Sequence, residues 1–254
     1  MTKLVELSSK EHKTLNVVPS AIIEYASKQH VLPVSAVEIA HAATCFPVFM
    51  SRNNVDGGWS FSAMTSFLLN QNLFVENGAW QPVFQPSALR TYPLYLMKSP
   101  KDPEQFTVGF DPQNSAFSVT EGKELFAAEG KPSEHLAMVT KLLENELQHM
   151  QASFLFANTL EELGLLKAID LKVIYVNEQY NTIQGLHTID EDKFKTLPAE
   201  TLAQLNEKGY LMPIHAMLMS IYQLNALINK NNAHPDNVPV STVKMEVTKA
   251  FSHH

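Results

Sequence analysis

The clearest pattern along the chain is a stripe of apolar residues that begins after Pro132 and Ser133. Its members lie three or four positions apart, at Leu136, Val139, Leu143, Leu147, Met150, Phe154, Ala157 and Leu160. This spacing is typical of a helix with one apolar face, and Gly164 is a favoured residue just beyond a helix end. The pattern predicts a helix over residues 134–163, about 45 Å long at about 1.5 Å per residue. Leu143 and Leu147 are expected to lie in the core.

The first half of the chain instead contains short apolar runs separated by Pro, Asn and Gly. Such runs are typical of short strands joined by turns. Because no helix long enough for repeated parallel crossovers separates them, antiparallel pairing is favoured. We expect strands over 46–51, 92–97 and 106–110, a hairpin of 59–69 with 73–75, and short helices over 21–28, 35–45 and 87–90.

The second half predicts a hairpin, three helices and a polar tail. The hairpin comprises 171–176 and 180–186, and the helices cover 191–195, 199–208 and 212–229. Residues 231–254 are polar and contain Pro235 and Pro239, so this segment is expected to bury little. The alternative is a strand that docks through Val238, Val240 and Val243.

Together these elements predict an α+β fold. An antiparallel or mixed sheet, built from the first half and the 171–186 hairpin, would be covered by one long helix and a C-terminal helical cluster. The sequence contains no repeat of fixed period and no low-complexity tract. We expect a single α+β domain over residues 1–230, followed by a polar tail over residues 231–254.

Composition and charge exclude several classes of protein. The 254 residues are 45% hydrophobic and 18% charged, which excludes a disordered chain. The formal net charge of −7 argues against a nucleic-acid partner, because proteins that bind the phosphate backbone carry basic surfaces. A single cysteine excludes an internal disulfide.

The beginning of the chain lacks the apolar segment of a secretion signal, because Glu6 and Glu11 interrupt any such run. A membrane-spanning helix needs about 20 consecutive apolar residues. The two most apolar stretches, 36–50 and 211–227, are interrupted by polar residues and proline. We therefore expect a soluble, cytoplasmic protein without a membrane span.

Two Glu-x-x-His motifs, Glu38 with His41 and Glu146 with His149, are candidate metal ligands. Residues i and i+3 of a helix share a face, and two such pairs on facing helices form a di-iron carboxylate site. Such sites use four long helices, however, and the helix that contains Glu38 is short. Glu38 can instead complete the helix cap that begins at Ser35. No cofactor is predicted, and iron or another divalent metal is the alternative.

Glu146, His149 and His187 are also candidate catalytic residues. Glu146 lies on the apolar stripe, where a carboxylate is costly to bury unless it is paired; the alternative is a residue at the helix edge whose carboxylate reaches solvent. His187 forms a His-x-x-Asp pair with Asp190, although Asp190 is also placed to cap the helix over 191–195. The sequence contains no Gly-x-Gly-x-x-Gly, Walker, Gly-x-Ser-x-Gly or His-Glu-x-x-His motif.

Aromatic residues are concentrated between Trp59 and Tyr95. Trp80 and Phe84 alternate with prolines, so an extended segment would present both rings on one face. Such a cluster usually lies in a core; the alternative is a groove that binds a peptide or a flat ligand. Trp80 is expected to be exposed, because it follows the turn at 76–78. The candidate ligand-binding residues are Trp59, Trp80, Phe84 and Tyr92.

Several stretches of the sequence resemble the SapC family. They are Val37-Glu-Ile-Ala-His-Ala-Ala with Phe46-Pro-Val-Phe, Asn72-Leu-Phe-Val-Glu-Asn-Gly-Ala-Trp80, Leu89-Arg-Thr-Tyr-Pro-Leu94, Leu160-Glu-Glu-Leu-Gly-Leu-Leu166, and parts of the segment 185–211. They follow one another in order over residues 15–228. The resemblance implies a soluble bacterial protein with an accessory role beside surface-layer, uptake or flavin-halogenase-like genes. It implies no catalytic residue that could be assigned to a position of this chain.

These observations predict an accessory or binding protein that holds a peptide or a partner protein for a surface-layer, secretion, uptake or peptide-modification system. The missing catalytic motifs and the aromatic cluster favour this function. The alternative is a metal-dependent enzyme that uses Glu and His residues of the helices. A structural role within a homo-oligomer is a third hypothesis.

Overall fold

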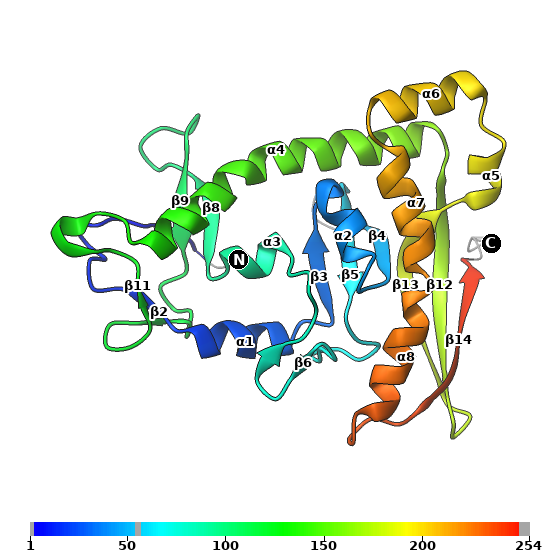
Figure 1. Ribbon diagram of the computed structural model, residues 1–254, viewed down its shortest axis with the longest axis horizontal. Helices are drawn as coiled ribbons and strands as arrows, with labels where there is room; N and C mark the ends of the chain where they lie inside the picture. Colours follow the sequence, from blue (N-terminus) through cyan, green and yellow to red (C-terminus); the bar gives the residue numbers. More distant parts are fainter. Residues whose placement is uncertain (1–2, 54–56, 249–254) are drawn as a thin grey trace, which may run out of the picture.

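The computed structural model describes residues 3–53 and 57–248, and its main sheet has six strands (Figure 1). The strand order is β14-β12-β13-β4-β5-β3, and neighbouring strands run antiparallel. The strands are β3 (Val31–Val34), β4 (Val48–Arg52), β5 (Trp59–Met64), β12 (Leu166–Tyr175), β13 (Tyr180–Ile189) and β14 (Val240–Val247). The predicted α+β class and the antiparallel pairing are confirmed.

Two three-stranded sheets, ordered β1-β9-β8 and β10-β2-β11, lie at the other end of the molecule (Figure 1). Their strands are β1 (Val5–Glu6), β2 (Asn16–Val17), β8 (Leu94–Lys98), β9 (Phe106–Phe110), β10 (Phe117–Ser118) and β11 (Lys123–Glu124). A short hairpin joins β6 (Val75–Glu76) to β7 (Ala79–Trp80). The predicted hairpin of 59–69 with 73–75 is wrong, because β5 pairs with β3 and β4 instead.

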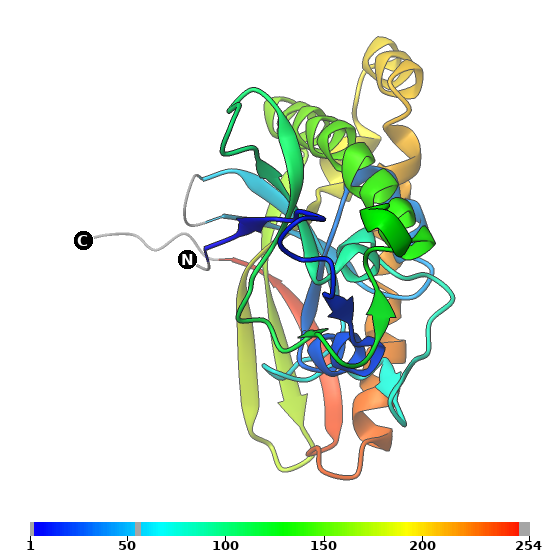
Figure 2. The same cartoon turned by 90° about the vertical axis from the view of Figure 1, so that its left-hand side faces the viewer.

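The longest helix, α4 (Glu134–Glu162), connects the two ends of the molecule (Figure 1), and Figure 2 views it obliquely along its length. It begins at Ser133, whose hydroxyl accepts a hydrogen bond from the backbone N–H of Leu136 at 3.1 Å. It ends before Gly164, whose φ of 63° lies in the left-handed region that favours glycine. The helix predicted over 134–163 is therefore confirmed, with its stop signal.

The two ends of α4 belong to two different hydrophobic cores. Leu136, Val139 and Leu143 pack in a smaller core with Leu94 and Phe110 of β8 and β9. The last turns contribute Phe156, Ala157 and Leu160 to the larger core on the main sheet.

The middle of α4 leaves its apolar stripe largely uncovered. Leu143 is 3% exposed, but Leu147 is 37% exposed, Met150 58% and Phe154 63%. The expectation that Leu147 lies in the core is wrong. The reason is geometric, because this part of the helix lies between the turns that belong to the smaller core and the turns that belong to the larger core.

Helices α7 (Leu211–Ser220) and α8 (Gln223–Ala233) cover one face of the main sheet (Figure 1). Together they form a stretch, Leu211–Ala233, that is long and apolar enough by composition to be a candidate membrane span. In this structure Ile214, Met217 and Leu227 of that stretch are fully buried in the larger core. The helices and helical turns besides α4 are α1 (Pro19–Ser27), η1 (Ala36–Glu38), α2 (Ile39–Ala42), α3 (Ser87–Thr91), η2 (Ala128–Gly130), α5 (Glu191–Lys195), α6 (Ala199–Glu207), α7 (Leu211–Ser220) and α8 (Gln223–Ala233).

The segment expected as a polar tail contains strand β14, which forms an edge of the main sheet. Val240 is 2% exposed, and its backbone N–H and C=O bond to the side chain of Asn232 at 2.6 and 2.9 Å. The expectation that this segment buries little is wrong for β14, and the alternative of a docked strand is confirmed for Val240 and Val243. Residues 249–254 of the segment lie outside the described residues.

Candidate functional site

A cleft of about 570 Å³ lies between the exposed middle of α4 and the edge of the main sheet that contains β3 and β5. Its walls come from α4, from the start of β5, from the end of β3 with the following turn, and from the first residues of α3. The side chains that line it include Ser35, Glu38, Arg52, Trp59, Phe61, Ser87, Glu146, Met150, Ser153, Phe154 and Glu161. The cleft thus combines carboxylates and hydroxyls with the apolar side chains of Phe61, Met150 and Phe154.

Glu38 fixes one end of the cleft through four hydrogen bonds. One carboxylate oxygen accepts from the backbone N–H and the hydroxyl of Ser35, each at 2.9 Å. The other accepts from the N–H and hydroxyl of Ser87, at 2.8 and 2.7 Å. The cap predicted for Ser35 and Glu38 is confirmed. Because both oxygens are used, Glu38 ties the turn after β3 to the start of α3.

Glu146 lies across from Glu38 and is a different kind of carboxylate. It is half-buried, and it forms no hydrogen bond or ion pair with any residue in 3–53 or 57–248. Burial raises the pKa of Glu146 above its ordinary value, and the negative charge of Glu38 raises it further, while His149 has a smaller opposite effect. The cleft therefore contains a partly desolvated carboxylate that forms no ion pair with any residue in the described part of the chain.

We expect Glu146→Gln to stabilise the protein slightly at neutral pH. The raised pKa means that the folded state favours the protonated carboxyl, so ionisation above that pKa costs stability. The glutamine variant avoids this cost, and its advantage should vanish as the pH falls through the ordinary glutamate value of 4.5. Melting temperatures of both proteins between pH 4 and pH 8 test this, and an advantage that grows toward low pH would contradict it.

Trp59 is held in one orientation on the cleft wall by two charged residues. Its indole N–H donates to the carboxylate of Glu161 at 2.9 Å, and the guanidinium of Arg52 lies 4.1 Å from its ring centroid. Arg52 and Glu161 also form an ion pair. Trp59 is a candidate from the sequence, whereas its two partners, from β4 and from the last turn of α4, belong to no sequence motif.

Of the two Glu-x-x-His motifs, only the glutamates line the cleft. Glu38 and Glu146 line the same cleft, whereas His41 is exposed and lies against Phe84, with ring centroids 6.1 Å apart. His149 is half-buried, and its Nδ1 atom has no hydrogen-bond partner among the described residues. Within residues 3–53 and 57–248, no group of three or more His, Cys, Asp and Glu side chains is placed to hold a metal ion.

His187 lies on the far side of Trp59, beside a smaller pocket of about 330 Å³. The rings of His187 and Trp59 meet edge to face at 4.8 Å. Burial is the main cause that lowers the pKa of His187. His187 therefore contacts Trp59 but does not line the cleft that contains Glu146.

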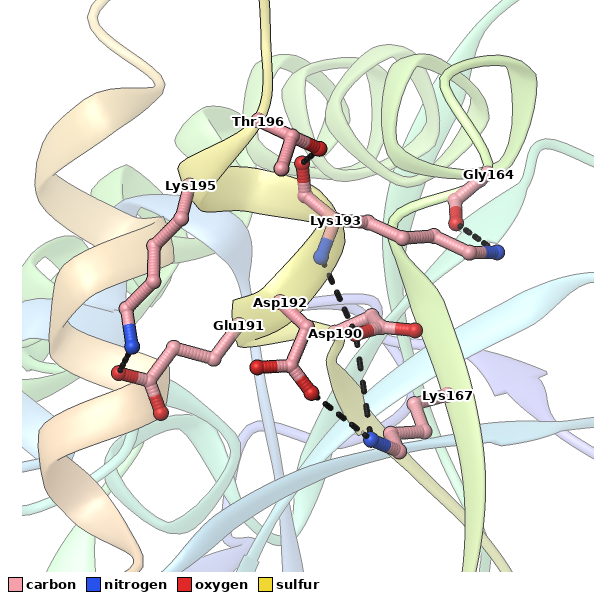
Figure 3. Close-up of polar contacts among 8 residues, drawn as sticks. All are labelled: Gly164, Lys167, Asp190, Glu191, Asp192, Lys193, Lys195 and Thr196. Carbon is pink, nitrogen blue, oxygen red and sulfur yellow. Dashed lines mark hydrogen bonds and ion pairs between the residues drawn. The ribbon is translucent and has the colours of Figure 1, made fainter.

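Asp190 caps α5, as the sequence predicts (Figure 3). Its carboxylate accepts a hydrogen bond from the backbone N–H of Lys193 at 3.3 Å, and the ammonium of Lys167 lies 3.9 Å away. The side chain of Lys193 in turn donates to the carbonyl of Gly164 at 2.9 Å, which joins α5 to the end of α4 (Figure 3). The carboxylate of Asp190 therefore already has two partners, the backbone N–H of Lys193 and the ammonium of Lys167.

The four candidate aromatic residues do not form one groove. Trp59 lines the cleft. The indole of Trp80 is partly buried, packs against the core and donates to the carbonyl of Phe84 at 3.1 Å. Tyr92 is 8% exposed and stacks on Tyr25 at a centroid distance of 3.8 Å. The apolar lining of the cleft includes Phe61 of β5 and also Met150 and Phe154, two members of the stripe on α4.

Comparison with known proteins identifies a family for most of the chain. The SapC family model matches residues 7–227. No curated protein and no solved structure matches the chain. The matched range includes every residue named above as lining the cleft, whereas β14 lies beyond it.

Proposed function

The chain belongs to the SapC family, and from this premise we propose that it is a binding protein that holds a peptide, or an extended segment of a partner protein, in the cleft beside α4. We propose further that it works in the cytoplasm as an accessory to a surface-layer, secretion, uptake or peptide-modification system. The observation that carries the proposal is the cleft. Its volume of about 570 Å³ falls within the range of about 300–1,000 Å³ that is common for ligand sites.

The apolar side chains at the cleft support a ligand with apolar groups. Met150 is 58% exposed and Phe154 is 63% exposed, one turn apart on the same face of α4. Large apolar side chains that remain exposed beside a cleft are typical of binding surfaces. A bound segment would cover both side chains and remove their apolar surface from water, which is the main favourable contribution to such binding.

The polar side chains support a ligand that also carries donors. The free carboxylate of Glu146 can accept hydrogen bonds from a backbone or side-chain N–H of a bound segment. Trp59 offers a flat surface that its contacts with Arg52 and Glu161 already hold in place. A binding residue that is ordered before the ligand arrives loses little conformational entropy on binding.

A library of N-acetylated hexapeptides tests the proposal. We expect selected peptides to bind the full chain, and Phe154→Asp to weaken this binding tenfold or more, since removal of a central apolar anchor commonly costs about 2 kcal/mol. Met219→Asp is the matched control, because Met219 is 65% exposed on α7 and does not line the cleft. Equal effects of the two substitutions, or no peptide selected at all, would contradict the proposal.

A metal-dependent enzyme is the second candidate, and one observation favours it. Glu38 and Glu146 lie on the same cleft, and among the described residues Glu146 has no ion-pair partner. Metal analysis of protein purified without a histidine tag tests it. Stoichiometric iron, zinc or manganese that is lost in Glu146→Gln would support the enzyme, and a protein that retains none after incubation with these metals would remove it.

A further inference from the structure

Strand β14 forms an open edge of the main sheet. Among the described residues it pairs only with β12, and it is the first strand in the order β14-β12-β13-β4-β5-β3 (Figure 1). The opposite edge, β3, contains Pro33, which is a common protection against further strand pairing. β14 contains no proline, so its unpaired backbone groups can pair with another strand.

The side chains of β14 divide cleanly between the two faces of the sheet. Val243, Met245 and Val247 lie opposite Val173, Leu171 and Ile169 of β12, which are buried beneath the helices. The helices do not extend fully over the edge, so Met245 remains 45% exposed and Val247 61% exposed. An apolar surface therefore continues to the edge of the sheet.

The charged residues of β14 lie opposite like charges. Lys244 faces Lys172 of β12, and Glu246 faces Asp170. Like charges directly opposite in an antiparallel pair are destabilising. Among the described residues, neither Lys244 nor Glu246 forms an ion pair. Within the part of the chain that the structure describes, the open side of each therefore offers no ion-pair partner.

We propose that β14 pairs antiparallel with β14 of a second copy of this chain, with the two-fold axis at Met245. In this register Lys244 lies opposite Glu246 of the second copy, and Glu246 opposite its Lys244. Val243 then lies opposite Val247, and the two Met245 side chains meet. Each like-charge pair within a chain gains an opposite charge across the interface, and the exposed apolar residues cover one another.

This interface has the closed two-fold symmetry of most homodimers. It joins two six-stranded sheets into one continuous sheet and leaves the cleft beside α4 outside the interface, because no cleft residue belongs to β14. The inference is therefore independent of the proposed function.

Two opposite charge reversals test the pairing. Because of the two-fold symmetry, Glu246→Lys places lysine opposite lysine at two positions, and Lys244→Glu does the same with glutamate. We expect each variant to weaken dimer formation about tenfold or more, since both cross-strand pairs change from attractive to repulsive. Within one chain each change is favourable, because it places opposite charges across from Asp170 or Lys172. Loss of the dimer would then not reflect loss of the fold.

Sedimentation velocity from micromolar to sub-millimolar concentration is the measurement, with circular dichroism melts to confirm folding. We expect the parent chain to dimerise, each variant alone to be mainly monomeric, and a mixture of the two to form heterodimers. The double variant, with both charges exchanged, should dimerise like the parent. A parent chain that stays monomeric throughout, or variants that dimerise as strongly as the parent, would overturn the proposal.

Discussion

Replacing Phe156 by alanine is expected to lower the free energy of unfolding by about 3–5 kcal/mol. Phe156 is fully buried. Its ring lies against Phe61 of β5 at a centroid distance of 5.6 Å, and against Tyr210 at the start of α7 at 5.0 Å. One side chain thus connects α4, the main sheet and the C-terminal helices. Its removal leaves a cavity where three elements meet, and such a site has little freedom to collapse.

Phe154, two residues earlier on the same helix, is the matched control. It is 63% exposed, so Phe154→Ala should change the free energy of unfolding by less than about 0.5 kcal/mol. Urea denaturation of both variants, followed by circular dichroism, measures the difference. Similar losses for both variants would contradict the assignment of Phe156 to the core and of Phe154 to the cleft.

Deleting residues 240–254 is expected to lower the free energy of unfolding by a comparable amount. Burial of Val240 alone contributes about 1.5–3 kcal/mol, and its two hydrogen bonds with Asn232 contribute about 1 kcal/mol each. The deletion also exposes β12 as a new edge of the sheet. A loss of about 4 kcal/mol corresponds to a fall in Tm of about 10 °C or more for a chain of this size.

A shorter deletion, of residues 249–254, is the control for this experiment. It leaves β14 and all of its pairing with β12 in place. Differential scanning fluorimetry and turbidity should separate the two proteins, with an early transition and aggregation for the longer deletion only. If the longer deletion melts like the parent, β14 contributes little to the fold.

The sequence predicts the elements of this protein better than it predicts which of their faces are covered. The spacing of the stripe and the residues at both ends predicted α4 correctly, because these are local properties of a helix. The same stripe contains Leu143, which is buried, and Phe154, which is exposed. Spacing shows that two residues share a face, but burial depends on what lies opposite that face.

The edge strand β14 is a case in which composition and periodicity point to different structures. Two prolines and many polar residues favoured a tail, yet Val243, Met245 and Val247 alternate with polar residues over the length of a strand. Alternation of period two is the signal of a strand with one covered face. The prediction of a tail instead followed the overall polar composition of residues 231–254.

The cleft was predicted only in fragments. Glu38, Glu146 and Trp59 were candidates from their own local patterns, and the structure brings all three to one site. Arg52 and Glu161 carry no motif, and they are 109 positions apart in the chain. Their contact depends on how α4 crosses the end of β4, which no local pattern encodes.

The placement of α4 also predicts which of its backbone amides exchange with deuterium most readily. One helix supplies side chains to both cores, whereas its central turns are covered by neither. Backbone amides near Leu143 and Phe156 should therefore exchange with deuterium only when a core opens. Those near Met150 lie in turns that belong to neither core, so they should exchange more readily. A ligand that covers Met150 and Phe154 would thus slow amide exchange most at the centre of α4, which is the part of the helix that neither core holds.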